Sequence, residues 1–290
     1  MLNDVNRVQA WFSEIYGDIA LGFRLVAVLD QVESAFQSIV VVDTLPYGKI
    51  LAIDGCVMTS ERDEFVYHEM LVHPALVAHS NPESVCIIGG GDGGTAREVL
   101  KHPDVKSVVV AELDAEVVRV CTEHFPALAG SFSNPTVNLV IGDGFEFLKN
   151  KQSAFDAILS DSIDPAGPGE ILFSGEFFKL VKHALRSGGV FVTQSGPFWN
   201  QLDTLRTCWL HLSEHFRFVR CYSASIPTYP TGTWCFLLAS DTVDPMAEVD
   251  PVRRKNIAAR CRYYTEFHQQ AAFVMPAFVK EALSAASSSP

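Results

Sequence analysis

The chain has 290 residues, of which 48% are hydrophobic and 19% are charged, a composition typical of one large or two small globular domains. Its net charge is -12 at pH 7 with histidine neutral, and its longest basic cluster is Arg253-Arg254-Lys255. This balance argues against a partner such as nucleic acid and is compatible with a cationic substrate.

The N-terminal part of the sequence, residues 1–60, is predicted to form a small antiparallel β-domain. Residues 1–20 are rich in aromatic side chains, and we interpret them as an ordered arm or part of an interface. Further along, Asp54-Gly55 is a hairpin signal between two short apolar runs. The predicted strands are Phe23–Leu29, Ile39–Val42, Ile50–Ile53 and Val57–Met58.

The remaining residues, 61–290, are predicted to form a Rossmann-like domain of the α/β class. A helix is expected from Glu61 to about His79, because Phe65, Met70 and Leu76 recur at helical spacing. Strands then alternate with helices, which implies a mostly parallel sheet covered on both faces. The last two strands have no helix between them and predict an antiparallel hairpin at one edge of the sheet.

The elements of this second domain follow one another closely. The predicted strands are Val85–Ile88, Ser107–Glu112, Val137–Ile141, Phe155–Ser160, Val190–Gln194, Arg217–Tyr222 and Trp234–Ala239. The predicted helices are Thr95–Lys101, Ala115–His124, a short one from Phe145, Gly175–Leu185 and Asn200–Phe216. A helical tail is expected from Asp250 to Leu283.

The first of these strands ends in a glycine-rich loop, Gly89-Gly90-Gly91-Asp92-Gly93-Gly94, which opens the next helix. Glycine allows positive φ and a close approach of backbone to a ligand. The loop satisfies the pattern Gly-x-Gly-x-x-Gly that is typical of dinucleotide sites. Asp92, however, puts a carboxylate where a pyrophosphate would lie, which argues for a cationic ligand instead.

Carboxylates follow four successive predicted strands: Asp92, Glu112, Asp143 and Asp161. Ligands of open α/β sheets bind at the carboxyl ends of the strands. The spacing from Gly89 to Glu112 suits a carboxylate that accepts hydrogen bonds from ribose hydroxyls. Asp143 can accept one from an adenine amino group, and Gly144 leaves room for the ring. For each acid taken singly, capping of a helix N-terminus is the alternative.

A second acidic loop, Asp161-Ser162-Ile163-Asp164-Pro165, favours an S-adenosyl compound over NAD. Paired carboxylates also occur in glycoside hydrolases and metal sites, but no sugar-binding groove or metal-spaced His or Cys residues accompany them here. An alkylammonium group becomes nucleophilic only after losing a proton, which a neighbouring carboxylate can accept. Tyr67, His68 and Tyr229 are candidate partners of such an amine, with simple packing roles as the alternative.

The cysteines and the N-terminus bear on the cellular compartment. Seven scattered cysteines with no Cys-x-x-Cys pair favour buried free thiols in a reducing compartment over disulfides or zinc. The N-terminus lacks the layout of a signal peptide, and no apolar stretch approaches the length of a membrane span. We therefore expect a cytoplasmic protein without a membrane partner.

Taken together, five motifs resemble the polyamine aminopropyltransferases, in order and from about Phe23 to Leu283. A sixth segment, Tyr263-Tyr264 with His268 and Ala271 to Pro276, is similar to the C-terminus of that family. The five motifs are Asp63-Glu64-Phe65-Val66-Tyr67-His68-Glu69-Met70, the glycine-rich loop with Arg97-Glu98, Gly142-Asp143-Gly144-Phe145, Asp161-Ser162-x-Asp164-Pro165-x-Gly167-Pro168 and Pro227-Thr228-Tyr229-Pro230-x-Gly232.

The resemblance implies transfer of an aminopropyl group from decarboxylated S-adenosylmethionine to putrescine, which yields spermidine and 5'-methylthioadenosine. It also implies a methyltransferase-like Rossmann domain behind the β-domain, a homodimer or homotetramer, and neither a metal nor a cofactor beyond the adenosyl co-substrate.

The resemblance also implies a role for each matching residue. Asp161 matches the general base, with Tyr67 orienting the amine. His68, Asp164 and Tyr229 match further amine-site residues, and Asp92 matches the carboxylate that holds the aminopropyl nitrogen. The nucleoside contacts match Gln37, Gly89, Gly91, Glu112, Asp143 and Gly144, with Pro168 at a lid position.

Other functions remain open at this point. Ile163 stands where the family usually has Ser, Thr or Asp, and Ser195 to Trp199 form a variable segment on the acceptor side. A putrescine N-methyltransferase shares the scaffold, and spermidine, agmatine or cadaverine are alternative acceptors. A non-catalytic polyamine- or nucleoside-binding protein is the alternative from a different class, and an NAD-dependent oxidoreductase is a more distant one.

Overall fold

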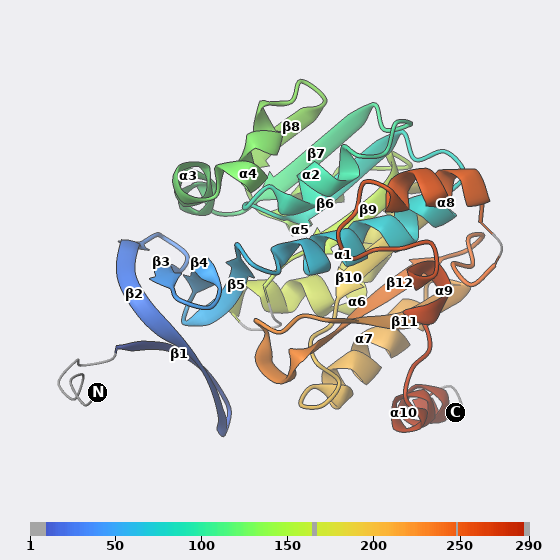
Figure 1. Ribbon diagram of the computed structural model, residues 1–290. Coiled ribbons are helices and arrows are strands. Elements are labelled where there is room, and N and C mark those ends of the chain that lie inside the picture. Colours follow the sequence, from blue (N-terminus) through green and yellow to red (C-terminus); the bar gives the residue numbers. More distant parts are fainter. Residues whose placement is uncertain (1–9, 164–166, 248, 287–290) are drawn as a thin grey trace.

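The computed structural model describes residues 10–163, 167–247 and 249–286. Two β-sheets organise them, a five-stranded sheet formed by residues near the N-terminus and a seven-stranded sheet that carries helices on both faces (Figure 1). The fold class predicted from the sequence, a small antiparallel β-domain followed by a mostly parallel Rossmann-like sheet, is confirmed. Within the described residues, no helix combines the length and the apolarity that a membrane crossing requires.

The N-terminal sheet is antiparallel and keeps its strands in chain order. Trp11–Tyr16 is its edge strand, so this part of the expected arm or interface segment belongs to the sheet. The predicted hairpin forms with Asp54 at φ 49° and Gly55 at φ 82°, the positive values that a tight primed turn requires. The strands are β1 (Trp11–Tyr16), β2 (Ile19–Glu33), β3 (Ser38–Thr44), β4 (Gly48–Ile53) and β5 (Cys56–Ser60).

The seven-stranded sheet has the order β11-β12-β10-β9-β6-β7-β8. Strands β6 to β10 are parallel, whereas β12 runs antiparallel to both of its neighbours, as the predicted edge hairpin requires. The strands are β6 (Ser84–Gly89), β7 (Ser107–Glu112), β8 (Val137–Ile141), β9 (Phe155–Asp161), β10 (Leu185–Gln194), β11 (Phe218–Ser225) and β12 (Thr233–Ser240).

The helices lie mostly where the alternation of apolar runs predicted them, with differences at their ends. The helix expected over Asn200–Phe216 is shorter, and the expected helical tail is divided into three pieces. The helices are α1 (Glu64–Ala78), α2 (Gly94–Val99), α3 (Ala115–His124), α4 (Pro126–Ala129), α5 (Gly144–Lys149), α6 (Gly175–Ala184), α7 (Leu202–Ser213), α8 (Pro251–Ala258), α9 (His268–Ala271) and α10 (Ala277–Ala286), with 3-10 turns η1 (Gly130–Ser133), η2 (Gly167–Phe173) and η3 (Pro230–Gly232).

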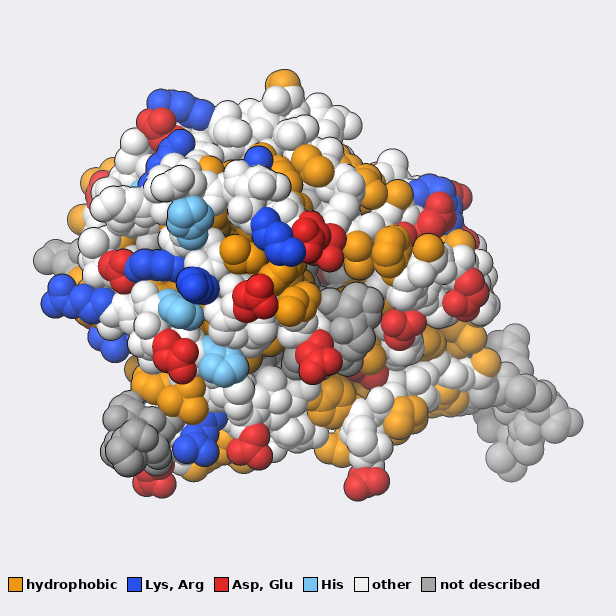
Figure 2. Space-filling model, turned by 180° about the vertical axis from the view of Figure 1, so that it is seen from behind, with side chains coloured by type: hydrophobic (Ala, Val, Ile, Leu, Met, Phe, Trp, Pro, Cys, Tyr) orange, Lys and Arg blue, Asp and Glu red, His pale blue; other side chains and the backbone are white. Residues whose placement is uncertain are grey.

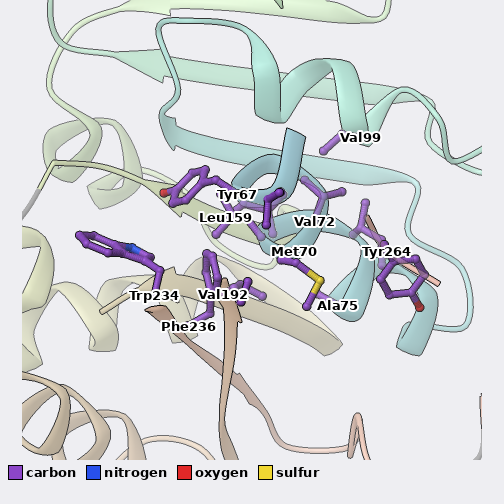
Figure 3. Packing of buried hydrophobic residues seen from close by; sticks show 14 of the residues in the cluster. Tyr67, Met70, Val72, Ala75, Val99, Leu159, Val192, Trp234, Phe236 and Tyr264 are labelled. Atoms are coloured by element: carbon purple, nitrogen blue, oxygen red, sulfur yellow. The ribbon is translucent and has the colours of Figure 1, made fainter. Parts of the chain in front are cut away.

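Helix α1 is buried on nearly every side, which the spacing of its apolar residues did not predict. Thirteen of its fifteen residues are buried, and four of those thirteen are ionisable: Glu64, His68, Glu69 and His73. Its apolar residues pack with β9, β10 and β12; in Figure 3, Tyr67 and Trp234 lie at one end of this cluster and Tyr264 at the other. Because burial of an unpaired charge is costly, each ionisable group needs a partner inside the protein.

Glu69 and His73 find their partners at the C-terminal end of α1. The Glu69 carboxylate is 1% exposed and accepts hydrogen bonds of 2.8 Å from the backbone N–H groups of Arg262, Tyr263 and Tyr264. His73 contacts Glu98 Oε2 at 3.0 Å through Nε2 and the ring of His102 at 3.0 Å through Nδ1. The Glu69 bonds fasten the C-terminal segment to the centre of the fold, whereas the His73 bonds join α1 to Glu98 of α2 and to His102.

Replacement of Glu69 by alanine is expected to lower the free energy of unfolding by about 3 to 5 kcal/mol, because three backbone donors lose their buried acceptor. Urea denaturation measures the change. Glu146→Ala is the control, since this exposed residue of α5 pairs only with Lys149 in the described structure. Equal midpoints for the two variants would contradict the assignment.

Candidate active site

A cavity of about 280 Å³ lies at the carboxyl ends of β6, β7 and β9, where the order of the parallel sheet reverses. This is the position at which open α/β sheets bind ligands. The N-terminal sheet closes it with side chains from β1, β4 and β5. The predicted site residues that line the cavity are Gln37, Tyr67, His68, Gly89, Gly91, Asp92, Glu112, Asp143, Gly144, Asp161 and Tyr229. Asp164 and the side chain of Pro168 lie outside the described residues.

The glycine-rich loop is shaped by its close approach to the neighbouring strand ends. Gly89 has a φ of +79°, and a Cβ atom there would lie 2.1 Å from the carbonyl oxygen of Asp161. A Cβ on Gly91 would lie 2.8 Å from the Glu112 carboxyl group. The glycines therefore let two acidic strand ends pack against the loop, in addition to leaving room for a ligand.

The predicted nucleoside residues occupy one half of the cavity. The Glu112 carboxylate accepts a hydrogen bond of 2.9 Å from the Asp114 N–H group, and Gln37 donates one of 3.0 Å to the Asp114 side chain. Asp143 Oδ1 accepts from the Phe145 N–H group at 2.7 Å, so this residue caps α5 and also lines the cavity. The capping role that the sequence left open for Asp143 is thus present in the structure.

Glu112 is 8% exposed, and its protonation follows from that burial. Burial disfavours the charged form and raises the pKa of this carboxyl to about 7, although the N–H groups of Asp114 and Gly91 oppose the change. The group therefore changes charge near neutral pH, which is unusual for a glutamate.

The opposite half of the cavity is built around His68. Its Nδ1 atom lies 2.7 Å from Glu64 Oε2, and its Nε2 atom lies 3.2 Å from Asp92 Oδ2. Burial alone would lower the pKa of the imidazole, but Asp92 and Glu64 outweigh it and raise this pKa well above its usual value. The raised pKa favours the imidazolium form of the ring, whose charge helps to hold the pKa of Asp92 low despite burial.

Asp161 lies at the end of β9, between the two halves of the cavity. Its Oδ2 atom accepts a hydrogen bond of 2.6 Å from Thr95 Oγ1, and its carboxyl also bonds the Tyr67 hydroxyl. Burial and the neighbouring charge of Asp92 raise the pKa of Asp161. A higher pKa makes a carboxylate a better proton acceptor, so this side chain is suited to general-base chemistry.

Aromatic side chains form the wall beyond Asp161. The rings of Tyr67 and Tyr229 meet edge to face at 5.9 Å, and Trp234 lies 4.6 Å from Tyr229. The Tyr229 hydroxyl donates to the Met58 carbonyl at 2.6 Å, and the buried Asp63 carboxylate accepts from the Thr228 N–H group at 3.0 Å. These bonds join the loop that carries Tyr229 to the end of the N-terminal sheet.

Among the lining residues that sequence reasoning missed are Glu14, Gln194 and Trp234. Glu14 is 3% exposed and comes from β1. A single carboxylate in the middle of an aromatic strand was the only signal for it. Gln194 donates at 3.3 Å to the carbonyl groups of Ser162 and Ile163, so it supports the acidic loop after β9.

The acidic groups of this half favour an organic cation over a metal ion. His68, Asp92 and Asp161 offer ligand atoms within 4.8 Å of one another. An imidazolium is not a metal ligand, however, because both of its nitrogens carry protons. An ammonium group instead can donate to both carboxylates while His68 keeps its two hydrogen bonds.

Comparison with known proteins agrees with the resemblance drawn from the motifs. Residues 64–250 match the spermine/spermidine synthase domain, and residues 10–61 match the spermidine synthase tetramerisation domain. The polyamine aminopropyltransferase of Moorella thermoacetica is 41% identical over 277 residues, covering 95% of this chain and 96% of that protein. The spermidine synthase of Schizosaccharomyces pombe is 38% identical over 287 residues, with 96% and 95% covered.

Solved structures give the same result. A spermidine synthase in complex with the transition-state analogue AdoDATO superimposes with a TM-score of 0.94 at 35% identity, covering 96% of each chain. The spermidine synthase of Thermotoga maritima gives a TM-score of 0.90 at 33% identity, covering 96% of this chain and 95% of its own.

Adenosine binding is expected to depend on pH through Glu112. The resemblance assigns Glu112 to the ribose hydroxyls, and on that assignment they donate to its ionised form, so affinity should increase as pH rises through 7 and be roughly tenfold weaker at pH 6 than at pH 8. In the free protein the sign is opposite: the raised pKa favours folding at low pH, and this contribution is lost as pH rises towards 7. Calorimetric titration at both pH values measures the binding effect.

The glutamine variant of Glu112 should bind adenosine with a nearly constant affinity over this range. Glu116→Gln, on the exposed side of α3, should retain the dependence of the parent. If Glu112→Gln still shows the tenfold change, another group is responsible.

Proposed function

Because the chain belongs to the spermine/spermidine synthase family and is a polyamine aminopropyltransferase, we propose that it transfers the aminopropyl group of decarboxylated S-adenosylmethionine to putrescine. The products are spermidine and 5'-methylthioadenosine. The observation that carries the proposal is a single cavity lined by Glu112 and Asp143 together with the carboxylates of Asp92 and Asp161 and with aromatic side chains.

The donor occupies the nucleoside half. Glu112 accepts from the ribose hydroxyls and Asp143 from the adenine amino group, with Gly144, Gly89, Gly91 and Gln37 beside them. Asp92 pairs with the ammonium of the aminopropyl arm. S-adenosylmethionine carries a carboxylate on the same arm, and two like charges in a partly buried site cost several kcal/mol. Asp92 therefore selects the decarboxylated donor.

The reaction is an in-line displacement at the methylene group next to the sulfonium. Asp161 takes one proton from the acceptor ammonium, and Tyr67 orients the nitrogen. A nitrogen–carbon bond forms as the carbon–sulfur bond breaks, and its electron pair stays on sulfur. The leaving thioether is neutral, so no general acid is required, and catalysis comes from positioning and deprotonation.

The acceptor lies along the wall formed by Tyr67, Tyr229 and Trp234. A diamine has a second ammonium, and the buried carboxylate of Glu14 is the partner that we assign to it. Tyr229 and His68 border the reacting end; Asp164, with Pro168 in the lid, completes the proposed set. Aminopropyl transfer to putrescine is favoured over methyl transfer to putrescine, because Asp92 disfavours S-adenosylmethionine, the methyl donor. Spermidine, agmatine and cadaverine remain the competing acceptors.

We further propose a cytoplasmic homodimer or homotetramer that requires neither a metal nor an additional cofactor. The strand β2 exposes Val26 and Val28 at 54% and 55%, and apolar side chains line the projecting hairpin of β1 and β2 in the rear view (Figure 2). Exposed apolar strands of this kind favour association. The seven cysteines are all free, and five are buried, which is compatible with a reducing compartment.

Incubation with decarboxylated S-adenosylmethionine and putrescine is expected to yield spermidine and methylthioadenosine, identified by product mass. Asp161→Asn should reduce turnover by roughly two to four orders of magnitude, because an amide cannot accept the proton. Single-turnover assays resolved by mass measure the identity of the products and the rate at which they form. Cadaverine, agmatine and spermidine are tested in parallel as acceptors.

Asp203→Asn, an exposed substitution on α7, is the matched control and should turn over like the parent. A methylated diamine formed from S-adenosylmethionine would refute aminopropyl transfer. Near-normal turnover of Asp161→Asn would refute the assignment of Asp161 as general base, but the proposed aminopropyl transfer would still stand.

Replacement of Glu14 by glutamine is expected to raise the KM for putrescine roughly tenfold or more, because a charge-assisted contact to the second ammonium is lost. The KM for the donor should not change. Butylamine lacks the second ammonium and should react equally with parent and variant. A similar loss with butylamine would show that Glu14 acts on the fold and not on the diamine.

A further inference from the structure

A line of charged side chains runs behind the cavity, from Arg97 to Asp92. Arg97 donates two hydrogen bonds of 2.9 Å to the carboxylate of Glu64, one from each terminal nitrogen. Glu64 contacts His68 Nδ1 at 2.7 Å, and His68 Nε2 lies 3.2 Å from Asp92. Of the four, His68 and Asp92 line the cavity, whereas Glu64 and Arg97 lie behind them.

The imidazole ring has little freedom in this arrangement. Its side chain is 3% exposed. A Cβ atom on Gly94 would lie 2.3 Å from the ring, so the N-terminal turn of α2 packs directly against it. The ring of Tyr67 meets it edge to face at 5.4 Å. Steric contact thus sets the plane of the His68 ring. The carboxylate of Glu64 influences which of the two ring nitrogens are protonated.

Asp92 depends on this ring for its orientation. Its Oδ1 atom is occupied by the Gly94 N–H group at 2.8 Å, and its Oδ2 atom faces His68. A doubly protonated ring donates to Glu64 and to Asp92 at once. A neutral ring has one proton, and when that proton is shared with Glu64 the second nitrogen repels the Asp92 carboxylate. The Glu64 charge favours the doubly protonated ring, which always presents a donor to Asp92, whereas a neutral ring donates to Asp92 in only one of its two tautomers.

We propose that Glu64 and Arg97 are positioning residues for donor selection: their ion pair holds His68 in the form that aims the Asp92 carboxylate at the aminopropyl ammonium. This inference rests on the proposed function, because it assigns Asp92 to that ammonium. Neither residue touches the donor, and both act through His68. Arg97 contributes by compensating the buried charge of Glu64, which otherwise costs several kcal/mol.

Glu98 supplies a matched control. Its carboxylate is fully buried and accepts from the same arginine, through Nε at 2.8 Å. Its other partners within the described residues are His73 and Lys101, neither of which lines the cavity, and no hydrogen bond or ion pair joins it to His68 or Asp92 there. Replacement of Glu98 therefore disturbs the ion pairs of Arg97 without removing a hydrogen-bond partner of His68.

The test is the ratio of two affinities, for decarboxylated S-adenosylmethionine and for methylthioadenosine, which lacks the ammonium. Calorimetry should show that Glu64→Gln lowers this ratio by about tenfold, while the affinity for methylthioadenosine stays near that of the parent. Glu98→Gln should destabilise the fold by at least as much and leave the ratio unchanged. In kinetics, Glu64→Gln should raise the KM of the donor by a larger factor than that of putrescine, because His68 borders the acceptor only at its reacting end.

Nitrogen NMR of His68 provides a readout that needs no donor. The parent should show two protonated ring nitrogens at pH 7, and Glu64→Gln should show one. If Glu64→Gln fails to fold, the double variant with Arg97→Gln removes both charges of the ion pair and should show the same loss in ratio and in spectrum. An unchanged ratio, or two protonated nitrogens in the folded variants, overturns the proposal.

A different result would contradict the proposed function. If the parent binds decarboxylated S-adenosylmethionine no better than methylthioadenosine, Asp92 does not hold the aminopropyl nitrogen and the assignment of the donor site falls. If the parent discriminates and Glu64→Gln discriminates equally well, the donor site stands and the positioning role alone is wrong.

Discussion

Helix α1 is buried almost completely, and this constraint determines much of the remaining structure. A helix with one exposed face can send its charged residues into solvent, but α1 cannot. Its acids and histidines must therefore be paired internally. In the N-terminal turns Glu64 and His68 pair with each other beside the cavity. In the C-terminal turns Glu69 pairs with the C-terminal segment, and His73 pairs with Glu98 of α2. One helix thus organises both the candidate site and the attachment of the C-terminal segment.

The arrangement of the cavity follows from a second constraint, the meeting of strand ends. The carboxyl ends of β6, β7 and β9 bring the glycine-rich loop, Glu112 and Asp161 into contact, and only glycine fits at the points of closest approach. Burial then separates the roles of the acids. Asp92 remains ionised because it faces an imidazolium, whereas Glu112 and Asp161 have raised pKa values. Groups of one chemical kind acquire different functions from their surroundings.

The sequence predicted the sheets, and it predicted that the acids after successive strands meet in one place, because both depend on local signals. Alternating apolar runs indicated the order of strands and helices, and acids directly after strands must lie at one edge of a parallel sheet. Which side chains pair with one another depends on tertiary packing, so the sequence did not predict these pairs. The pairing of Glu64 with both Arg97 and His68 has no signature in residue spacing, since Arg97 belongs to another helix. Glu14 was missed because its strand was interpreted as an arm or interface and its burial depends on the distant β5.

The strand β1 carries Glu14 on the face that borders the cavity, while its neighbour Ile15 is 66% exposed on the opposite face. Successive residues of a strand point in opposite directions, so one short segment borders both the cavity and the outer surface. On the proposed assignment of Glu14 to the second ammonium, a change in this six-residue edge strand alters the acceptor end of the cavity and leaves Glu112 and Asp143 untouched.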